Sequence, residues 1–284
     1  MRGGLVAVLP LLLAVVAVAA ERDAAAAEPA RARPAAARPL RLDDDLIDSP
    51  VFTVLPESVA GVETPRLSLC GPWRFAAQAP SDFASPELDD RQWPAIEVPG
   101  EWAMQGFTVP PGCAAAYRRR FAVPQDWSGY RIKLRCDAVY SDANVWVNGR
   151  PAGSHMGGFT AFELDVTDLV EPGKENLFAL AVKKESLTDE KFTTFGSKYA
   201  AFPIGGISRK MTLFAVPAAH LRDLYVTTAF DNEFRNATLN LALEVANEDT
   251  GALEDARVRL ELKDPSGNTV EIAPHPIPLK KAAA

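Results

Sequence analysis

The sequence has few of the residues that build metal centres and disulfide frameworks. Its 284 residues include three cysteines and three histidines, and no C-x-x-C pair occurs. Three cysteines allow at most one internal disulfide and leave one thiol. The histidines are far apart in the chain, so a zinc site built on them is not expected. These residues are Cys70, Cys113, Cys136, His155, His220 and His275.

Basic runs and recognisable cofactor motifs are also missing. The formal net charge is -7 and no Lys/Arg-rich run occurs, which argues against nucleic-acid binding. There is no G-x-S-x-G elbow, and the Gly-Gly pairs lack the strand–loop–helix setting of phosphate loops. The acidic run Asp43 to Asp45 is a candidate calcium site, but a solvated acidic run is the favoured interpretation. We therefore predict no cofactor and no metal.

The one long apolar run lies at the N-terminus. Arg2 precedes the run from Leu5 to Ala20, and Ala17-Val18-Ala19 has the pattern of a cleavage site. The run is shorter than the ~20 residues that cross a bilayer as a helix. We predict a signal peptide over residues 1–20, cleaved near Ala19, and a secreted or periplasmic protein with no membrane contact after cleavage. An uncleaved membrane anchor is the alternative.

Residues 21–40 are almost only Ala, Arg, Pro and Glu, which predicts a disordered linker. From Leu67 onward, short runs of Val, Ile, Leu, Phe and Tyr alternate with turn residues. Asn148-Gly149 is a strong hairpin signal because both residues tolerate positive φ. The pattern predicts an all-β antiparallel sandwich or jelly roll. The main strands are expected at residues 117–123, 130–137, 144–147, 159–166, 177–183 and 210–216.

Residues 219–284 form a second block of expected strands. Leu239, Leu241 and Val245 alternate with Asn240 and Glu244, as in a sheet with one buried face. An immunoglobulin-like sandwich needs about seven strands and ~100 residues. This block has room for about four, at residues 221–229, 238–246, 256–263 and 269–272. We therefore expect a partial immunoglobulin-like domain that continues past the end of the chain.

An ordered series of motifs runs from Leu69 to Pro217. It resembles the N-terminal jelly-roll domain of glycoside hydrolase family 2, which includes β-galactosidases, β-glucuronidases and β-mannosidases. The resemblance implies a galactose-binding-like jelly roll over residues 41–218, followed by the immunoglobulin-like block. The motifs are Leu69–Phe75 (LCGPWRF), Asp89–Trp93 (DDRQW), Val98–Trp102 (VPGEW), Tyr117–Trp127 (YRRRFAVPQDW), Ala143–Arg150 (ANVWVNGR), Gly157–Phe159 (GGF), Phe162–Thr167 (FELDVT) and Gly205–Arg209 (GGISR).

The resemblance also implies where catalysis belongs. Glycosidases use two carboxylates, which in this family lie on a (β/α)₈ barrel of ~250 residues. Nothing in this chain resembles that barrel, so no catalytic residue is assigned. The family's acid/base glutamate follows an Asn, but Asn232-Glu233 and Asn247-Glu248 are expected at turns, facing water.

The resulting hypothesis is a non-catalytic N-terminal portion of an exported, β-galactosidase-like enzyme. Such a portion braces the barrel and shapes the rim of its pocket. Its partners are the enzyme's own C-terminal barrel and, through the full-length enzyme, carbohydrate. The alternatives are a stand-alone carbohydrate-binding module and a structural accessory protein.

Family members that hydrolyse galactosides contact sugar through a loop Asn and an acidic residue. Counted from the neighbouring motifs, the corresponding positions in this chain are Tyr140 and a position near Ala200, and neither carries the expected polar group. The candidate sugar-binding residues are therefore Tyr140, Ser141, Lys198 and Tyr199, and a ligand-free surface loop is the alternative. Most tryptophans are expected to pack in the protein rather than to stack on sugar. They are Trp73, Trp93, Trp102, Trp127 and Trp146.

Overall fold

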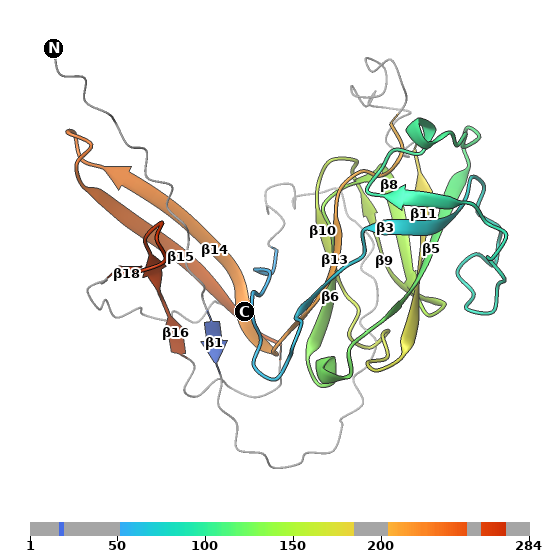
Figure 1. Cartoon of the computed structure of the whole chain (residues 1–284). Coiled ribbons are helices and arrows are strands. Elements are labelled where there is room, and N and C mark those ends of the chain that lie inside the picture. Colours follow the sequence, from blue (N-terminus) through green and yellow to red (C-terminus); the bar gives the residue numbers. More distant parts are fainter. Residues whose placement is uncertain (1–16, 20–51, 185–203, 249–256, 271–284) are drawn as a thin grey trace, which may run out of the picture. The chain divides into compact units, whose positions relative to one another are not determined.

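A computed structural model describes residues 17–19, 52–184, 204–248 and 257–270 of the chain, and the described part is almost entirely β (Figure 1). The predicted linker 21–40 lies outside these residues. Two units are distinguished, one of residues 23–250 and one of residues 1–22 with 251–284. The strands of the larger unit are β2 (Arg66–Ser68), β3 (Gly71–Ala76), β4 (Ala95–Val98), β5 (Ala114–Ala122), β6 (Arg131–Cys136), β7 (Val139–Tyr140), β8 (Asp142–Val147), β9 (Arg150–Met156), β10 (Phe162–Asp165), β11 (Glu175–Lys183), β12 (Gly206–Ile207), β13 (Met211–Val216), β14 (Ala219–Phe230) and β15 (Ala237–Asn247).

The described part of the chain also has two short helices and four short strands outside the larger unit's sheets. Two single-turn 3₁₀ helices, η1 (Ala103–Gln105) and η2 (Gln125–Trp127), lie in the larger unit. In the smaller unit, β1 (Ala17–Ala19) pairs with β16 (Arg257–Arg259), and β17 (Leu262–Lys263) pairs with β18 (Thr269–Val270). No helix in the described ranges is long and apolar enough to cross a membrane.

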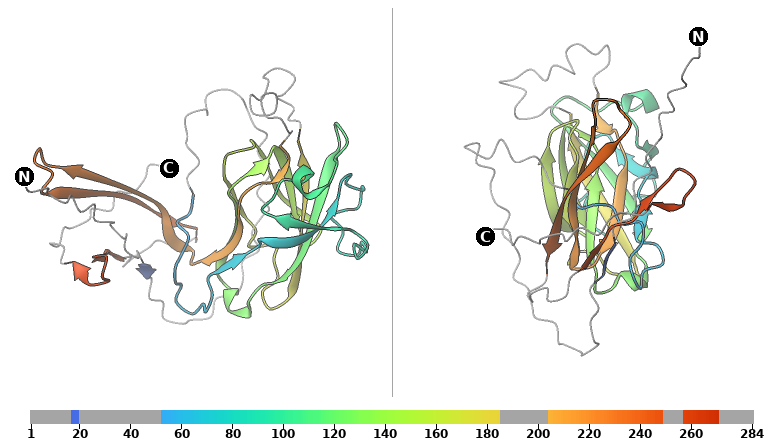
Figure 2. Two further views of the ribbon diagram at one scale, coloured as in Figure 1. Left: turned by 45° about the horizontal axis from the view of Figure 1, so that its top comes forward. Right: turned by 90° about the vertical axis from the view of Figure 1, so that its left-hand side faces the viewer.

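Two antiparallel sheets form the sandwich of the larger unit. One has four strands in the order β10-β6-β13-β2, and the other has six in the order β4-β3-β5-β11-β8-β9. Figure 2 shows them packed against each other, and side chains of both sheets contribute to one buried apolar cluster. The predicted all-β jelly-roll sandwich is confirmed. The six strands expected in this region all exist, as β5, β6, β8, β10, β11 and β13.

Two tryptophans of the core are buried with their indole N–H hydrogen-bonded. Trp127 is fully buried, and its indole N–H donates to the Thr64 carbonyl at 2.9 Å. Trp73 is also buried and donates to the Leu69 carbonyl at 2.8 Å. Burial of indole without such a partner would cost free energy. Trp102 is buried as well, and Trp93 and Trp146 are half-buried against a smaller apolar cluster, as the packing interpretation predicted.

The outer face of the six-stranded sheet has its own cover. Small side chains on the central strands, among them Ala116 and Ala179, leave room for Phe83 from the loop that joins β3 to β4. Phe83 also meets Trp146 edge-on, with ring centroids 5.0 Å apart. Because both of its faces are covered, β11 has seven consecutive buried residues.

A buried arginine on the sheet holds this loop by hydrogen bonds. Arg118 lies on β5 with no exposed surface, and its Nε donates to Asp90 Oδ2 at 2.7 Å. Its Nη1 donates to the carbonyls of Phe83 and Ser85, and its Nη2 donates to that of Leu88 at 3.2 Å. A guanidinium offers five donors in a fixed fork, which suits a loop that presents several carbonyls.

The Asn148-Gly149 signal marks a hairpin turn, as predicted. Asn148 has φ 49° and Gly149 has φ 77°, and the turn joins β8 to β9. Strand β9 was not expected from the sequence because Pro151 and Gly153 lie within it. It forms because it pairs along β8, with a register shift between Val145 and Trp146.

The second block contains strands at three of the four expected places, whereas the single strand expected at residues 256–263 is two separate strands, β16 and β17. Strands β14 and β15 pair over almost their whole length, and the turn from Asp264 to Asn268 joins β17 to β18.

Cys70, Cys113 and Cys136 are all unpaired, so the one internal disulfide that the composition permits does not form between them. Burial raises the pKa of the Cys136 thiol and keeps it protonated.

Replacement of Arg118 by Met should cost about 3–5 kcal/mol of unfolding free energy, because it leaves the Asp90 carboxylate and three carbonyls without their partner. The matched control is Arg120→Ala on the same strand. Its side chain is well exposed, contacts Glu175 at 3.7 Å and donates an exposed hydrogen bond to the Pro86 carbonyl at 2.7 Å, so we expect a loss of only about 0.5–1 kcal/mol. Urea denaturation of both variants measures the difference, and equal losses would contradict the pinning role of Arg118.

Candidate functional site

Four of the sequence motifs converge at one end of the sandwich. The Gly100 N–H donates to the Ile207 carbonyl at 2.8 Å, and the Trp102 N–H donates to the Gly205 carbonyl at 3.1 Å. The segment Gly205–Ile207, which contains β12, pairs on its other side with β7, where Gly206 lies opposite Tyr140. We call this region, made of residues 100–102, 117, 140–141, 157–159 and 205–207, the motif end.

Glycines allow this close approach. An added Cβ at Gly205 would lie 2.1 Å from the Trp102 ring, and one at Gly206 would lie 2.7 Å from the Tyr117 hydroxyl oxygen. Gly206 also has φ +116°, a backbone angle that residues other than glycine rarely adopt. The Gly-Gly pair is therefore required by packing, without any reference to a ligand.

Tyr140 is covered by the loop that follows β9. Its side chain is 2% exposed, and an added Cβ at Gly158 would lie 2.1 Å from its ring. The next residue, Phe159, is 58% exposed and meets the Tyr140 ring edge-on at 5.3 Å. The aromatic surface that this end presents to solvent thus comes from Phe159, with Tyr140 beneath it.

Ser141 is buried beside Tyr140 and is bonded to the backbone of β11 and the residue after it. Its Oγ donates to the Lys184 carbonyl at 3.0 Å, and its N–H donates to the Lys183 carbonyl at 2.8 Å. The side chains of Tyr140 and Ser141 therefore pack inside the protein, and their contact with sugar stays a prediction. The other two candidates, Lys198 and Tyr199, lie outside the described residues, as does Ala200.

Two polar groups at the motif end were not singled out from the sequence. One oxygen of Glu101, Oε2, accepts from the Met104 N–H at 2.7 Å. Within the described ranges, Glu101 Oε1 and the Tyr117 hydroxyl are buried with no partner at hydrogen-bonding geometry. Burial raises the pKa of Tyr117, the Glu101 charge raises it further, and the Ile207 backbone acts in the opposite direction. Tyr117 thus stays a neutral phenol, able to donate a hydrogen bond.

The described residues of the motif end offer hydrogen bonding and aromatic contact. Among the described residues, no group of three His, Cys, Asp or Glu side chains is placed to hold a metal ion. Of the two Asn-Glu pairs, Glu233 lies in the β14–β15 turn, where its N–H donates to Asp231. The expectation that Glu248 simply faces water is wrong, because it pairs with Lys133 at 2.7 Å and Arg131 at 2.9 Å.

The fold and these converging motifs define a jelly-roll domain whose glycine-rich segments meet at one end. Residues 67–217, more than half of the chain, match the sequence profile described as "Glycosyl hydrolases family 2, sugar binding domain". The chain therefore belongs to this family, as the motif series indicated.

Curated relatives and solved structures agree with this assignment. A β-galactosidase of Priestia megaterium is 26% identical over 239 residues, which cover 73% of this chain and 22% of the relative. A β-glucuronidase of Paenibacillus borealis is 28% identical over 167 residues, which cover 53% of this chain and 27% of the relative. The solved Bacteroides uniformis β-glucuronidase 2 superposes with a TM-score of 0.56 at 25% identity, over 72% of this chain and 26% of that one. The chain thus spans about a quarter of the length of such relatives.

Substitution of Gly158 by Ala should destabilise the protein by about 1–3 kcal/mol, because the new methyl group overlaps the Tyr140 ring. The same substitution in a Tyr140→Leu background should cost less, because the smaller side chain vacates the overlapping volume. Denaturation of the four proteins of this double-mutant cycle measures the coupling. An identical cost in both backgrounds would show that Gly158 is not held against Tyr140.

Proposed function

We propose that the chain is the N-terminal, non-catalytic portion of an exported glycoside hydrolase of family 2, similar to the β-galactosidases. In this role it braces a catalytic barrel and forms part of the rim of the substrate pocket. The observation that carries the proposal is the family match over residues 67–217 in a chain that covers only 22% of its β-galactosidase relative.

The arrangement of the motif end supports the rim role. The segments that carry the family motifs are bonded together there by backbone hydrogen bonds and close glycine contacts. Phe159 at this end and Met104, two residues after Trp102, are exposed apolar side chains. Such side chains suit contact with a neighbouring domain or with the apolar face of a sugar ring.

Export is a separate part of the proposal, and it rests on the sequence alone. The order of Arg2, the apolar run and Ala17-Val18-Ala19 is that of a secretory signal. Identification of the mature N-terminus by Edman degradation should find it close to Glu21.

A second candidate function is a stand-alone carbohydrate-binding module. The observation in its favour is the exposed aromatic ring of Phe159, which follows Gly157-Gly158 and contacts Tyr140. Such a module must bind glycans by itself, whereas a rim-forming portion needs the remainder of its enzyme for affinity.

Purified protein incubated with nitrophenyl β-galactoside, β-glucuronide and β-mannoside should release no nitrophenol above the blank, because no barrel carboxylates are present to cleave the bond. A full-length family 2 enzyme assayed in parallel serves as the positive control. Calorimetric titration with the corresponding oligosaccharides should likewise give no heat of binding. Turnover would overturn the non-catalytic assignment, and binding would favour the carbohydrate-binding module.

The reading frame past Ala284 provides an independent check. We expect it to continue with strands that complete the second sandwich, followed by a barrel that carries an Asn-Glu acid/base pair. A stop codon directly after Ala284 would contradict the proposal and favour an accessory protein.

A further inference from the structure

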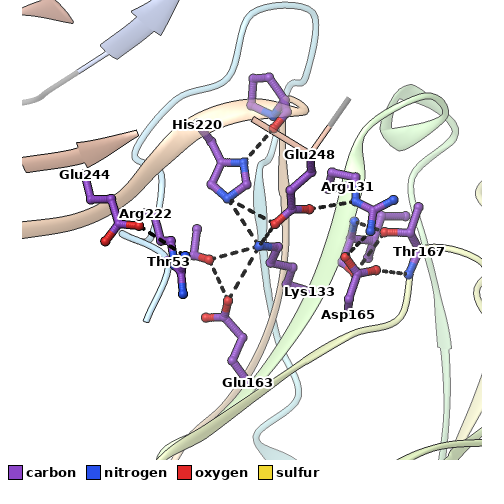
Figure 3. A network of polar contacts seen from close by, with 12 residues as sticks. Thr53, Arg131, Lys133, Glu163, Asp165, Thr167, His220, Arg222, Glu244 and Glu248 are labelled. Atoms are coloured by element: carbon purple, nitrogen blue, oxygen red, sulfur yellow. Dashed lines mark hydrogen bonds and ion pairs between the residues drawn. The ribbon is translucent and has the colours of Figure 1, made fainter. Parts of the chain in front are cut away.

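The base of the β14–β15 hairpin contacts the four-stranded sheet through polar side chains, of which Thr53, Lys133 and His220 are buried (Figure 3). Only the first three residues of β14, Ala219–Leu221, are buried. Two backbone hydrogen bonds lie at this base. One joins it to the segment before β2, from the Val54 N–H to the Leu221 carbonyl at 3.2 Å, and the other closes the hairpin itself, from the Glu248 N–H to the Ala218 carbonyl at 2.9 Å. We call the side chains of Thr53, Arg131, Lys133, Glu163, His220 and Glu248 the hairpin joint.

Lys133 is the centre of the hairpin joint. It lies on β6, and its side chain is 9% exposed. Its ammonium group donates to Glu248 Oε1 at 2.7 Å and to Thr53 Oγ1 at 3.2 Å, and it lies 3.2 Å from His220 Nε2. An ammonium group has three donors and no acceptor, so these three contacts use all of its hydrogens.

The neighbours of His220 fix its protonation state. Nδ1 lies 2.9 Å from the Pro217 carbonyl oxygen, which only accepts, so Nδ1 carries a hydrogen. Nε2 faces the Lys133 ammonium group, which only donates, so Nε2 is the acceptor. Only the neutral imidazole with its hydrogen on Nδ1 satisfies both contacts.

The surrounding charges are already balanced without a charge on His220. On β6, Arg131 and Arg135 accompany Lys133, and these three cations face three carboxylates. Arg131 pairs with Asp165 and with Glu248 Oε2, and Arg135 pairs with Glu163 Oε2 at 2.8 Å. Glu248 Oε1 lies 3.7 Å from His220 Nε2, but both of its oxygens are engaged by Lys133 and Arg131.

We propose that His220 makes the hairpin joint proton-sensitive, so that acid releases the base of the β14–β15 hairpin from β6. Protonation puts an N–H on Nε2, which removes the hydrogen bond from Lys133 and sets two cations 3.2 Å apart in a buried place. This device is independent of the glycosidase role proposed above.

The pH range of this response follows from the direction in which the surroundings of His220 shift its pKa. Burial lowers the pKa of His220 below its ordinary value of 6.5, the Lys133 charge lowers it further, and Glu248 and the carbonyls of Pro217 and Ala218 act in the opposite direction. A base with a lowered native pKa stabilises the folded form fully above its ordinary pKa. That stabilisation is lost as the pH falls below 6.5 toward the native pKa.

Hydrogen exchange and NMR titration of the whole chain test the proposal. Between about pH 7.5 and about pH 5.5, exchange corrected for its intrinsic pH dependence should show a several-fold loss of protection at the Val54 and Glu248 amides. Amides in the middle of β11, such as that of Leu180, should keep their protection over the same range, because the hairpin joint opens locally. The imidazole resonances of His220 should titrate below 6.5 in the unmodified protein.

His220→Gln supplies a neutral acceptor for Lys133 that cannot be protonated, so it should abolish the acid-induced loss at Val54 and Glu248. The matched control is His155→Gln. His155 lies on β9 and contacts Thr160 at 3.1 Å, so this variant should keep the loss. In Lys133→Met, the pKa of His220 should rise because the neighbouring cation is gone.

Three outcomes would overturn the proposal. The first is a wild-type His220 that titrates at or above 6.5, a measurement that needs no variant. The second is an acid response of His220→Gln equal to that of the wild type. The third is loss of protection at Val54 and Glu248 only together with β11, which would mean global unfolding.

Discussion

One apolar layer, buried between the four-stranded and six-stranded sheets, is the constraint on which the rest of the larger unit depends. A sheet has two faces, and the core occupies one face of each sheet. The central strands nevertheless have consecutive buried residues, as in β5, where Ala115, Ala116, Tyr117 and Arg118 are all buried. Each sheet therefore needs a second cover on its outer side.

The two outer faces are covered by different physical means. On the six-stranded sheet, small alanines admit Phe83, and Arg118 holds the covering loop by its carbonyls. On the four-stranded sheet, Lys133 is paired with carboxylates and with a neutral histidine. Arginine keeps its charge at any physiological pH, whereas histidine changes charge between about pH 5 and 8. The guanidinium of the first cover thus keeps its charge over this range, whereas the second cover contains a histidine.

The sequence predicted the elements whose signals are local. Short apolar runs between turn residues placed β11 and β13, and Asn148-Gly149 located the turn after β8 because its backbone geometry needs those residues. Strands β9 and β12 were missed because glycine and proline weaken the local signal, and they form through pairing with β8 and β7. The interactions of Glu248 were also missed, because its partners on β6 lie more than a hundred residues earlier in the chain.

The motif end shows why a family signature does not by itself identify ligand contacts. Gly205 is fixed by the Trp102 ring and Gly158 by the Tyr140 ring, so these motif residues are accounted for by packing. The structure, and not the spacing of the motifs, places Tyr140 beside the Gly-Gly-Ile segment, where Gly206 of β12 lies opposite it. Spacing gives the position of a residue along a strand and not its depth, which here depends on the loop over Tyr140. The side chain that reaches solvent at this position is therefore Phe159, from a different motif.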